Sequence, residues 1–179
     1  RNTYENLGEE ARTKEMREAV ATDFAEIEFL NVEFITGIDD LSDSVRYHYE
    51  FKIPAALTSI SGMEIMSVPI TDMITSLGFM SSDDRKSAVE LWSAFSFEDY
   101  EEEIRIKMPE GKTTQLPEKQ ILNSDYIEYE LSAKMDGKDV IVTRKFKLLQ
   151  DQVPPADFLA LKEQCRKIIK ADDFKLALN

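Results

Sequence analysis

Cys165 and His48 are the only cysteine and the only histidine in the chain, and these are the residue types that form a thiol nucleophile and its general base. Such a pair requires the histidine to lie within hydrogen-bond reach of the sulfur and to be oriented by a third group. Cys165 follows Phe158 and Leu161 and precedes Ile168 at spacings of three and four, which predicts the apolar side of an amphipathic helix. His48 falls on the polar side of an alternating strand. We therefore expect Cys165 to be a packed, unreactive thiol.

Metal chemistry has little support in the sequence. A zinc site takes three or four ligands, mainly from cysteine and histidine, and the chain has one of each. Asp39, Asp40 and Asp43 in GIDDLSDS offer carboxylates to calcium, but without the EF-hand spacing or its closing glutamate. We interpret this segment as an acidic turn, with adventitious calcium as the alternative, and expect no metal and no cofactor.

The acidic run FEDYEEE, from Phe97 to Glu103, is the remaining candidate for catalysis. A glycosidase needs two carboxylates across a cleft, but with 35 acidic residues in the chain no pair stands out. Acidic residues leading into a strand are typical of a solvated sheet edge. The chain also lacks a Walker loop, GxGxxG and GxSxG. We expect no catalytic, cofactor-binding or metal-binding residues, so the fragment should not be an enzyme by itself.

Length and charge limit the remaining functions. The 179 residues suit one domain, or one domain with an appendage. Lys and Arg number 22 against 35 Asp and Glu, giving a net charge of -13, which disfavours nucleic acid and anionic membrane surfaces as partners. No apolar run approaches the roughly 20 residues of a transmembrane helix. Because the chain opens at Arg1 without a signal-peptide pattern, we expect a fragment or a processed piece.

Short alternating strands lie between two helical patterns. Good helix formers predict a first, partly exposed helix from Gly8 to about Thr22. The following strand, AEIEFLNVEFI, changes phase at Phe29-Leu30, which indicates a β-bulge. The segment from Val45 to Ile53 alternates most clearly, and EEIRIKMP alternates again before a turn at PEG. The segment from Met63 to Met80 has no clear assignment.

A hairpin and a closing helix are predicted near the end of the chain. Tyr126–Met135 should pair with Val140–Leu149 across Asp136-Gly137, which tolerates the positive φ angles of a tight turn. Pro154 and Pro155 end the last strand and precede the helix. The helix should cover a sheet with its apolar side, leaving four polar side chains in water: Lys162, Glu163, Arg166 and Lys167.

These patterns predict a mainly β (α+β) fold. We expect an antiparallel β-sandwich-like domain, with an N-terminal helix and with a C-terminal helix packed on the sheet. Residues 1–24 should form a helical segment leading in from an upstream domain. Residues 25–179 should form the β-sandwich-like domain that the C-terminal helix closes.

Four stretches resemble the C-terminal β domain of exported bacterial transglutaminase-like proteins, a domain of unknown function that follows the transglutaminase-like core. They span most of the chain: GEEARTKEMREAV, DRKSAVELW, MPEGKTTQLPE and VTRKFKLLQDQVPPADFLALKEQCRKIIKADDFKLAL. The resemblance implies that the core's Cys, His and Asp lie upstream of Arg1. No catalytic residue of the family can therefore be carried onto this chain.

Two functions follow as alternatives. In the first, the chain is a non-catalytic accessory domain of an exported transglutaminase-like, cysteine-protease-like protein, whose upstream core is its partner. In the second, it is an independent extracytoplasmic module that binds a peptide or a glycan on a concave, aromatic-lined groove. The extracytoplasmic location, periplasmic or secreted, is implied by the resemblance alone.

Overall fold

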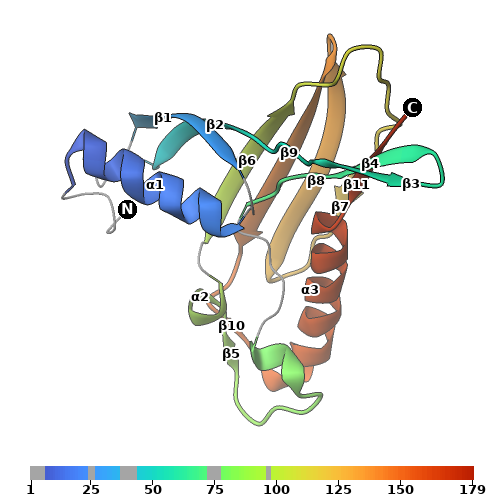
Figure 1. The fold of residues 1–179 in the computed structure, drawn as a ribbon. Coiled ribbons are helices and arrows are strands. Elements are labelled where there is room, and N and C mark those ends of the chain that lie inside the picture. Colours follow the sequence, from blue (N-terminus) through green and yellow to red (C-terminus); the bar gives the residue numbers. More distant parts are fainter. Residues whose placement is uncertain (1–6, 24–26, 37–43, 72–77, 96–97) are drawn as a thin grey trace. The chain divides into compact units, whose positions relative to one another are not determined.

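The computed structural model describes residues 7–23, 27–36, 44–71, 78–95 and 98–179, and Figure 1 shows the course of the chain. The chain divides into two compact units, Arg1–Ala56 and Leu57–Asn179. Compactness alone does not decide where an independently folding domain begins, so the boundary expected after residue 24 stays a prediction.

The first unit contains helix α1, Glu9–Asp23, and the antiparallel strands β1, Glu28–Thr36, and β2, Arg46–Lys52. Two glutamates in the first turn of α1 suit the positive end of its dipole. Met16 is buried, while most of the described side chains around it are exposed. The prediction of a partly exposed helix is confirmed.

The two strands of this unit also follow the predicted pattern. Their register shifts between Phe29 and Asn31, which confirms the bulge. Tyr47, Tyr49 and Phe51 lie along one face of β2, with neighbouring ring centroids 6.0 and 5.8 Å apart. The polar side chains of β2 are exposed, as predicted: Arg46, His48, Glu50 and Lys52.

The second unit is built on a four-stranded antiparallel sheet in the order β6-β9-β8-β7. Its strands are β6 (Asp99–Ile106), β7 (Gln120–Ile121), β8 (Ile127–Asp136) and β9 (Asp139–Leu148). Burial alternates along the whole of β6 and along the first half of β8, which directs every second side chain there toward the core. The long strands run side by side in Figure 1. The acidic run falls largely on β6, an edge strand, where Asp99, Glu101 and Glu103 are exposed.

The hairpin of β8 and β9 has the predicted pairing. Met135 pairs with Val140 at one end and Ile127 with Leu148 at the other. The turn differs by one residue from the prediction, because Asp136 pairs with Asp139 and leaves Gly137 and Lys138 as the loop. Only Gly137, with φ 62°, has a positive φ in this loop, which is the pattern of a type II′ turn, where the first loop residue alone requires glycine.

A three-stranded antiparallel sheet in the order β11-β4-β3 joins the two ends of this unit. It consists of β3 (Leu57–Ile60), β4 (Met63–Ser67) and β11 (Lys175–Leu178). Ser61 and Gly62, both with positive φ, link β3 to β4 as in a type I′ turn. The sequence left β4 unassigned, and it did not predict that a strand follows the last helix.

Short elements complete the unit. Strand β5, Val89–Glu90, pairs with β10, Gln152–Val153, and leads into α2, Leu91–Ala94. Two 3-10 turns also occur, η1 at Gly78–Ser81 and η2 at Pro155–Asp157. The turn predicted at PEG is present, because Lys112 N–H donates to the Pro109 carbonyl and Gly111 has φ 76°.

Helix α3, Phe158–Asp172, lies beside β8 of the four-stranded sheet (Figure 1). Phe158, Leu161, Cys165 and Ile168 are all buried, as their spacing predicted. The chain is thus an α+β protein with mainly antiparallel sheets, and a helix packs on the sheet as expected. No helix in the described ranges is long and apolar enough to span a membrane.

Candidate functional site

A buried ion pair between Arg144 and Asp172 stands at the centre of the second unit. Arg144 projects from the core face of β9, and Asp172 is the last residue of α3. The guanidinium donates to both carboxylate oxygens, from Nε to Oδ1 at 3.0 Å and from Nη2 to Oδ2 at 2.9 Å. Both side chains are 0% exposed. Such two-point geometry is the strongest arrangement of an arginine with a carboxylate, and it offsets part of the cost of burying both charges.

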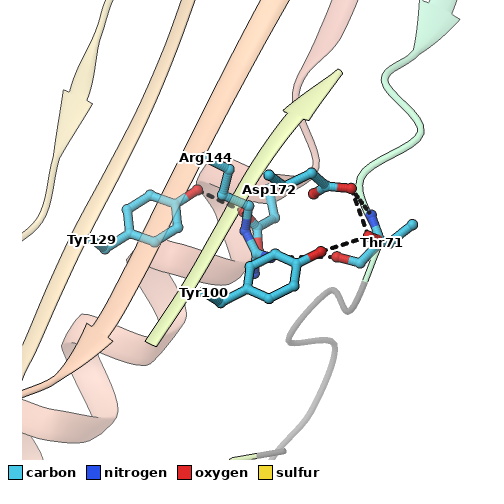
Figure 2. A network of polar contacts seen from close by, with 6 residues as sticks. Thr71, Tyr100, Tyr129, Arg144 and Asp172 are labelled. Atoms are coloured by element: carbon cyan, nitrogen blue, oxygen red, sulfur yellow. Dashed lines mark hydrogen bonds and ion pairs between the residues drawn. The ribbon is translucent and has the colours of Figure 1, made fainter. Parts of the chain in front are cut away.

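Further polar groups extend this pair into a network, which Figure 2 shows. The Tyr129 hydroxyl on β8 donates to Asp172 Oδ1 at 2.6 Å. Arg144 Nη1 donates to the carbonyl oxygen of Thr71, a few residues past β4, at 3.3 Å. The guanidinium also lies over the Tyr100 ring, with 5.6 Å from Cζ to the centroid.

Thr71 connects the network to strand β6. Its backbone N–H and its hydroxyl both donate to Glu102 Oε1, at 3.1 and 2.6 Å. Its Oγ1 lies 2.8 Å from the Tyr100 hydroxyl. The network, defined as Thr71, Tyr100, Glu102, Tyr129, Arg144 and Asp172, therefore joins the segment after β4 to three strands and to the end of α3.

The centre of the network is suited to holding elements together rather than to reacting with a substrate. Arg144, Asp172 and Tyr129 are all buried, so their side chains are shielded from solvent. Burial, reinforced by the nearby Asp172 carboxylate, raises the pKa of the Tyr129 phenol far above its ordinary value. Tyr129 therefore stays a hydrogen-bond donor throughout the physiological pH range.

Two further polar contacts attach α3 along its length. The Gln164 amide donates to the carbonyl oxygens of Leu122 and Ile127, at 2.8 and 3.0 Å, and its oxygen accepts from Ser124 Oγ at 2.6 Å. Just before α3, the Tyr126 hydroxyl donates to the Asp157 carboxylate. This hydrogen bond raises the pKa of Tyr126. The helix is thus fixed near its start, middle and end.

Lys162 corrects one prediction. We expected this side chain in water, but it is buried, and its Nζ donates to Asp83 Oδ1 at 2.6 Å and to the Ser82 carbonyl oxygen at 2.9 Å. Asp83 itself is exposed, and its hydrogen bond with Lys162 lowers the pKa of the carboxyl group. The aliphatic stem of Lys162 packs inside the protein, while its ammonium group reaches Ser82 and Asp83.

Residues of the segment 78–85 also contact the first turn of α3. Phe79 meets Phe158 edge-on, with ring centroids 6.2 Å apart, and the Arg85 guanidinium lies 5.6 Å from the centroid of the Phe158 ring. These contacts, together with Lys162 and Asp83, fasten residues 78–85 to the helix.

Two of the residues that the sequence singled out for chemistry, Cys165 and His48, belong to different units. Cys165 is fully buried, and burial raises the pKa of its thiol to about 12. His48 belongs to the first unit, on the exposed face of β2. Asp39, Asp40 and Asp43 lie outside the described residues. Over the described ranges, no group of three or more His, Cys, Asp or Glu side chains is arranged to hold a metal ion.

One shallow hollow of about 320 Å³ lies on the four-stranded sheet. Its lining is mostly charged, and β6, β8 and β9 contribute these charged side chains: Asp99, Glu101, Glu128, Glu130, Lys145 and Lys147. Lys145 pairs with Glu101 at 3.0 Å, so part of the lining charge is neutralised across strands. The lining also includes Ile121 and three aromatic residues, Tyr100, Tyr129 and Phe146, so a peptide- or glycan-binding groove stays a prediction.

Residues 63–178 match a family described as a domain of unknown function with a solved structure, DUF3858. The chain belongs to the DUF3858 family. The matched region begins at the first residue of β4 and ends at the last residue of β11, so it includes every residue of the buried network. The expectation of a domain of unknown function is confirmed, whereas the link to transglutaminase-like proteins stays a prediction.

The fold of this DUF3858 chain is similar to that of a solved structure from Parabacteroides distasonis, described as "a putative protease". The two share 15% sequence identity at a TM-score of 0.50, over 64% of this chain. The matched part amounts to 23% of the Parabacteroides chain, so this chain spans about a quarter of its solved neighbour. No curated protein matches the chain.

Sequence reasoning missed the network of the DUF3858 domain, although two of its residues carry a readable signal. Arg144 is in phase with Val140, Val142 and Phe146, the apolar side of its strand. Asp172 follows Ile168 by four residues and thus continues the apolar side of the last helix. Two opposite charges on two buried faces indicate an ion pair, because a lone buried charge is costly.

Proposed function

We propose that this chain is a non-catalytic accessory domain of a larger, exported bacterial protein with a transglutaminase-like, cysteine-protease-like core. It packs on that core or positions it. The observation that carries the proposal is where the reactive side chains lie. Cys165 is buried with a thiol pKa of about 12, and the charged groups at the centre of the network are bonded to one another inside the fold.

Two further observations support this role. The solved neighbour, described as a "putative protease", is about four times longer than the part that resembles this chain, which leaves room for a separate catalytic domain. The hydrogen bonds and the ion pair inside the second unit also suit a rigid domain that holds another domain in place. The alternative, a peptide- or glycan-binding module, stays a prediction.

The test compares the larger protein with this chain alone. Incorporation of dansylcadaverine into a glutamine-containing peptide would report transglutaminase chemistry, and cleavage of the same peptide would report proteolysis. We expect turnover from the larger protein, a changed kcat or KM when residues 57–179 are deleted, and none from this chain alone. Turnover by this chain that is lost in Cys165→Ala would contradict the proposal.

A further inference from the structure

The free edges of the sheets in the second unit are not equivalent. On the four-stranded sheet, edge strand β6 carries charged side chains, and β7 has two residues. Charge and shortness are two ways in which proteins prevent unwanted strand pairing. On the three-stranded sheet, the C-terminal end of β11 is covered, because Thr113 and Asn179 exchange backbone hydrogen bonds of 3.1 and 2.9 Å beside it and Thr114 Oγ1 donates to the Ala177 carbonyl oxygen.

Strand β3 is the exception. It lies at the other edge of the three-stranded sheet, all four of its residues are exposed, and its sequence, LTSI, contains no charge and no proline. Within the described residues, β3 pairs with β4 alone. Because Ile60 and Met63 flank a two-residue turn, they form a hydrogen-bonded pair, and alternation then directs the N–H groups of Leu57 and Ser59 away from β4.

Apolar side chains surround this open edge. Ile60 and Met63 are opposite one another on the outer face of the hairpin and are 51% and 46% exposed. Ile65 and Ala177, paired across β4 and β11, continue the same face and are half-buried. An uncharged edge next to exposed aliphatic side chains is the arrangement that accepts an added strand.

We propose that β3 is a docking edge for an extended segment of the larger protein, uncharged and apolar at alternate positions, which adds as a fourth strand. This inference rests on the proposed function and names the surface through which the accessory domain contacts its core. The solved neighbour's chain extends far beyond the matched 23%, and a larger protein built in the same way would have chain to supply the segment. A second copy is disfavoured, because each copy has a net charge of -13 and the copies repel one another.

Two substitutions test the edge and one controls for them. Ser59→Pro removes an N–H that points away from β4, so it blocks strand addition without removing a hydrogen bond within the hairpin. Ile60→Lys places a charge beside the edge. Ile121→Lys is the matched control, because Ile121 is 57% exposed on the short strand β7 and receives the same charge change.

The measurement is backbone hydrogen exchange in the larger protein and in this chain alone. We expect the Leu57 and Ser59 amides to exchange at least ten-fold more slowly in the larger protein. Ser59→Pro should abolish the protection at Leu57, Ile60→Lys should weaken it at both amides, and Ile121→Lys should leave it intact. Equal exchange in both proteins overturns the docking edge, and so does protection in this chain alone that grows with concentration, which would identify a second copy.

The same data separate failure of the docking edge from failure of the proposed function. If other residues of 57–179 gain protection in the larger protein while β3 does not, the domain packs on its core through another surface, and only the edge assignment is wrong. If no residue of 57–179 gains protection, both the edge and the accessory role are wrong.

Discussion

Arg144 and Asp172 form a two-point ion pair that joins the middle of β9 to the last residue of α3, and neither side chain is exposed to solvent. Removal of one partner leaves the other charge buried and uncompensated. We therefore expect Arg144→Met or Asp172→Asn to lower the free energy of unfolding by about 3–5 kcal/mol, measured by urea denaturation. The double variant Arg144→Met/Asp172→Leu should recover much of this loss, because it removes both charges.

Arg105 provides the control for this prediction. It also contacts two aspartates, Asp136 at 2.8 Å and Asp139 at 3.2 Å, but in an exposed position. Water replaces these contacts when the arginine is removed. Arg105→Met should therefore change stability far less than Arg144→Met, and similar losses for both variants would contradict the importance of burial.

The Tyr129 hydroxyl should contribute measurably to the network. Tyr129→Phe keeps the ring but deletes the hydroxyl, which donates a buried hydrogen bond of 2.6 Å to Asp172 Oδ1. We expect a loss of about 1–3 kcal/mol in the free energy of unfolding, typical of a buried acceptor that loses a partner. Tyr126→Phe deletes a similar hydroxyl-carboxylate contact nearer the surface. If Tyr126→Phe lowers the free energy of unfolding as much as Tyr129→Phe does, burial of the Tyr129 hydrogen bond does not explain its contribution.

The apolar side chains of α3 should stabilise the fold through the volume that they fill, and the Cys165 sulfur should contribute less. Leu161→Ala and Ile168→Ala each leave a cavity and should lower the free energy of unfolding by about 2–5 kcal/mol, measured by urea denaturation. Cys165→Ala removes a smaller side chain and should cost less. Deletion of everything after Val153 should prevent the second unit from folding cooperatively, and an unchanged melting temperature would show that the helix is dispensable.

The buried thiol predicts an alkaline loss of stability. The pKa of Cys165 is raised by burial from 9.0 to about 12, so the folded state holds the thiol proton more tightly than the unfolded state. This contribution is fully present below pH 9 and declines as pH rises toward 12. Cys165→Ala should remove this component from the pH profile of unfolding. Native protein should also react with a thiol reagent at pH 8 far more slowly than urea-unfolded protein does; equal rates would show an accessible cysteine.

Lys162 should hold residues 78–85 against α3. In Lys162→Met the stem is conserved but the donor to Asp83 and to the Ser82 carbonyl is lost. We expect faster hydrogen exchange in residues 78–85, with little change in β8 and β9. Lys167→Met, on an exposed position of the same helix, is the matched control. Unchanged exchange in residues 78–85 would show that the aromatic contacts of Phe158 hold the segment without the lysine.

Local patterns predicted the parts of the fold that depend on neighbouring residues. The register of β8 with β9 follows from a two-residue turn and from alternation on both sides of it. The position of Cys165 follows from helical spacing within one segment. In each case the pairing residues or the repeating residues are close in the sequence, so a short window contains the signal.

The unpredicted parts depend on distant residues. Strand β4 pairs with β11, more than a hundred positions later, and each strand is too short to show a clear period of its own. Lys162 looks like a solvent-facing lysine on a helical wheel, because the segment that buries it is remote in sequence. Sheet partners and buried cations of this kind depend on tertiary contacts that a single sequence does not display.

The pairing of β4 with β11 also determines when this unit can finish folding. Leu178 pairs with Glu64, so the three-stranded sheet cannot close until the residues of β11 have left the ribosome. Until then β4 is paired with β3 alone, and its other edge is open to other chains. A stalled or truncated product that ends before Lys175 should therefore aggregate during synthesis, even though the β8–β9 hairpin and the whole of α3 are already present.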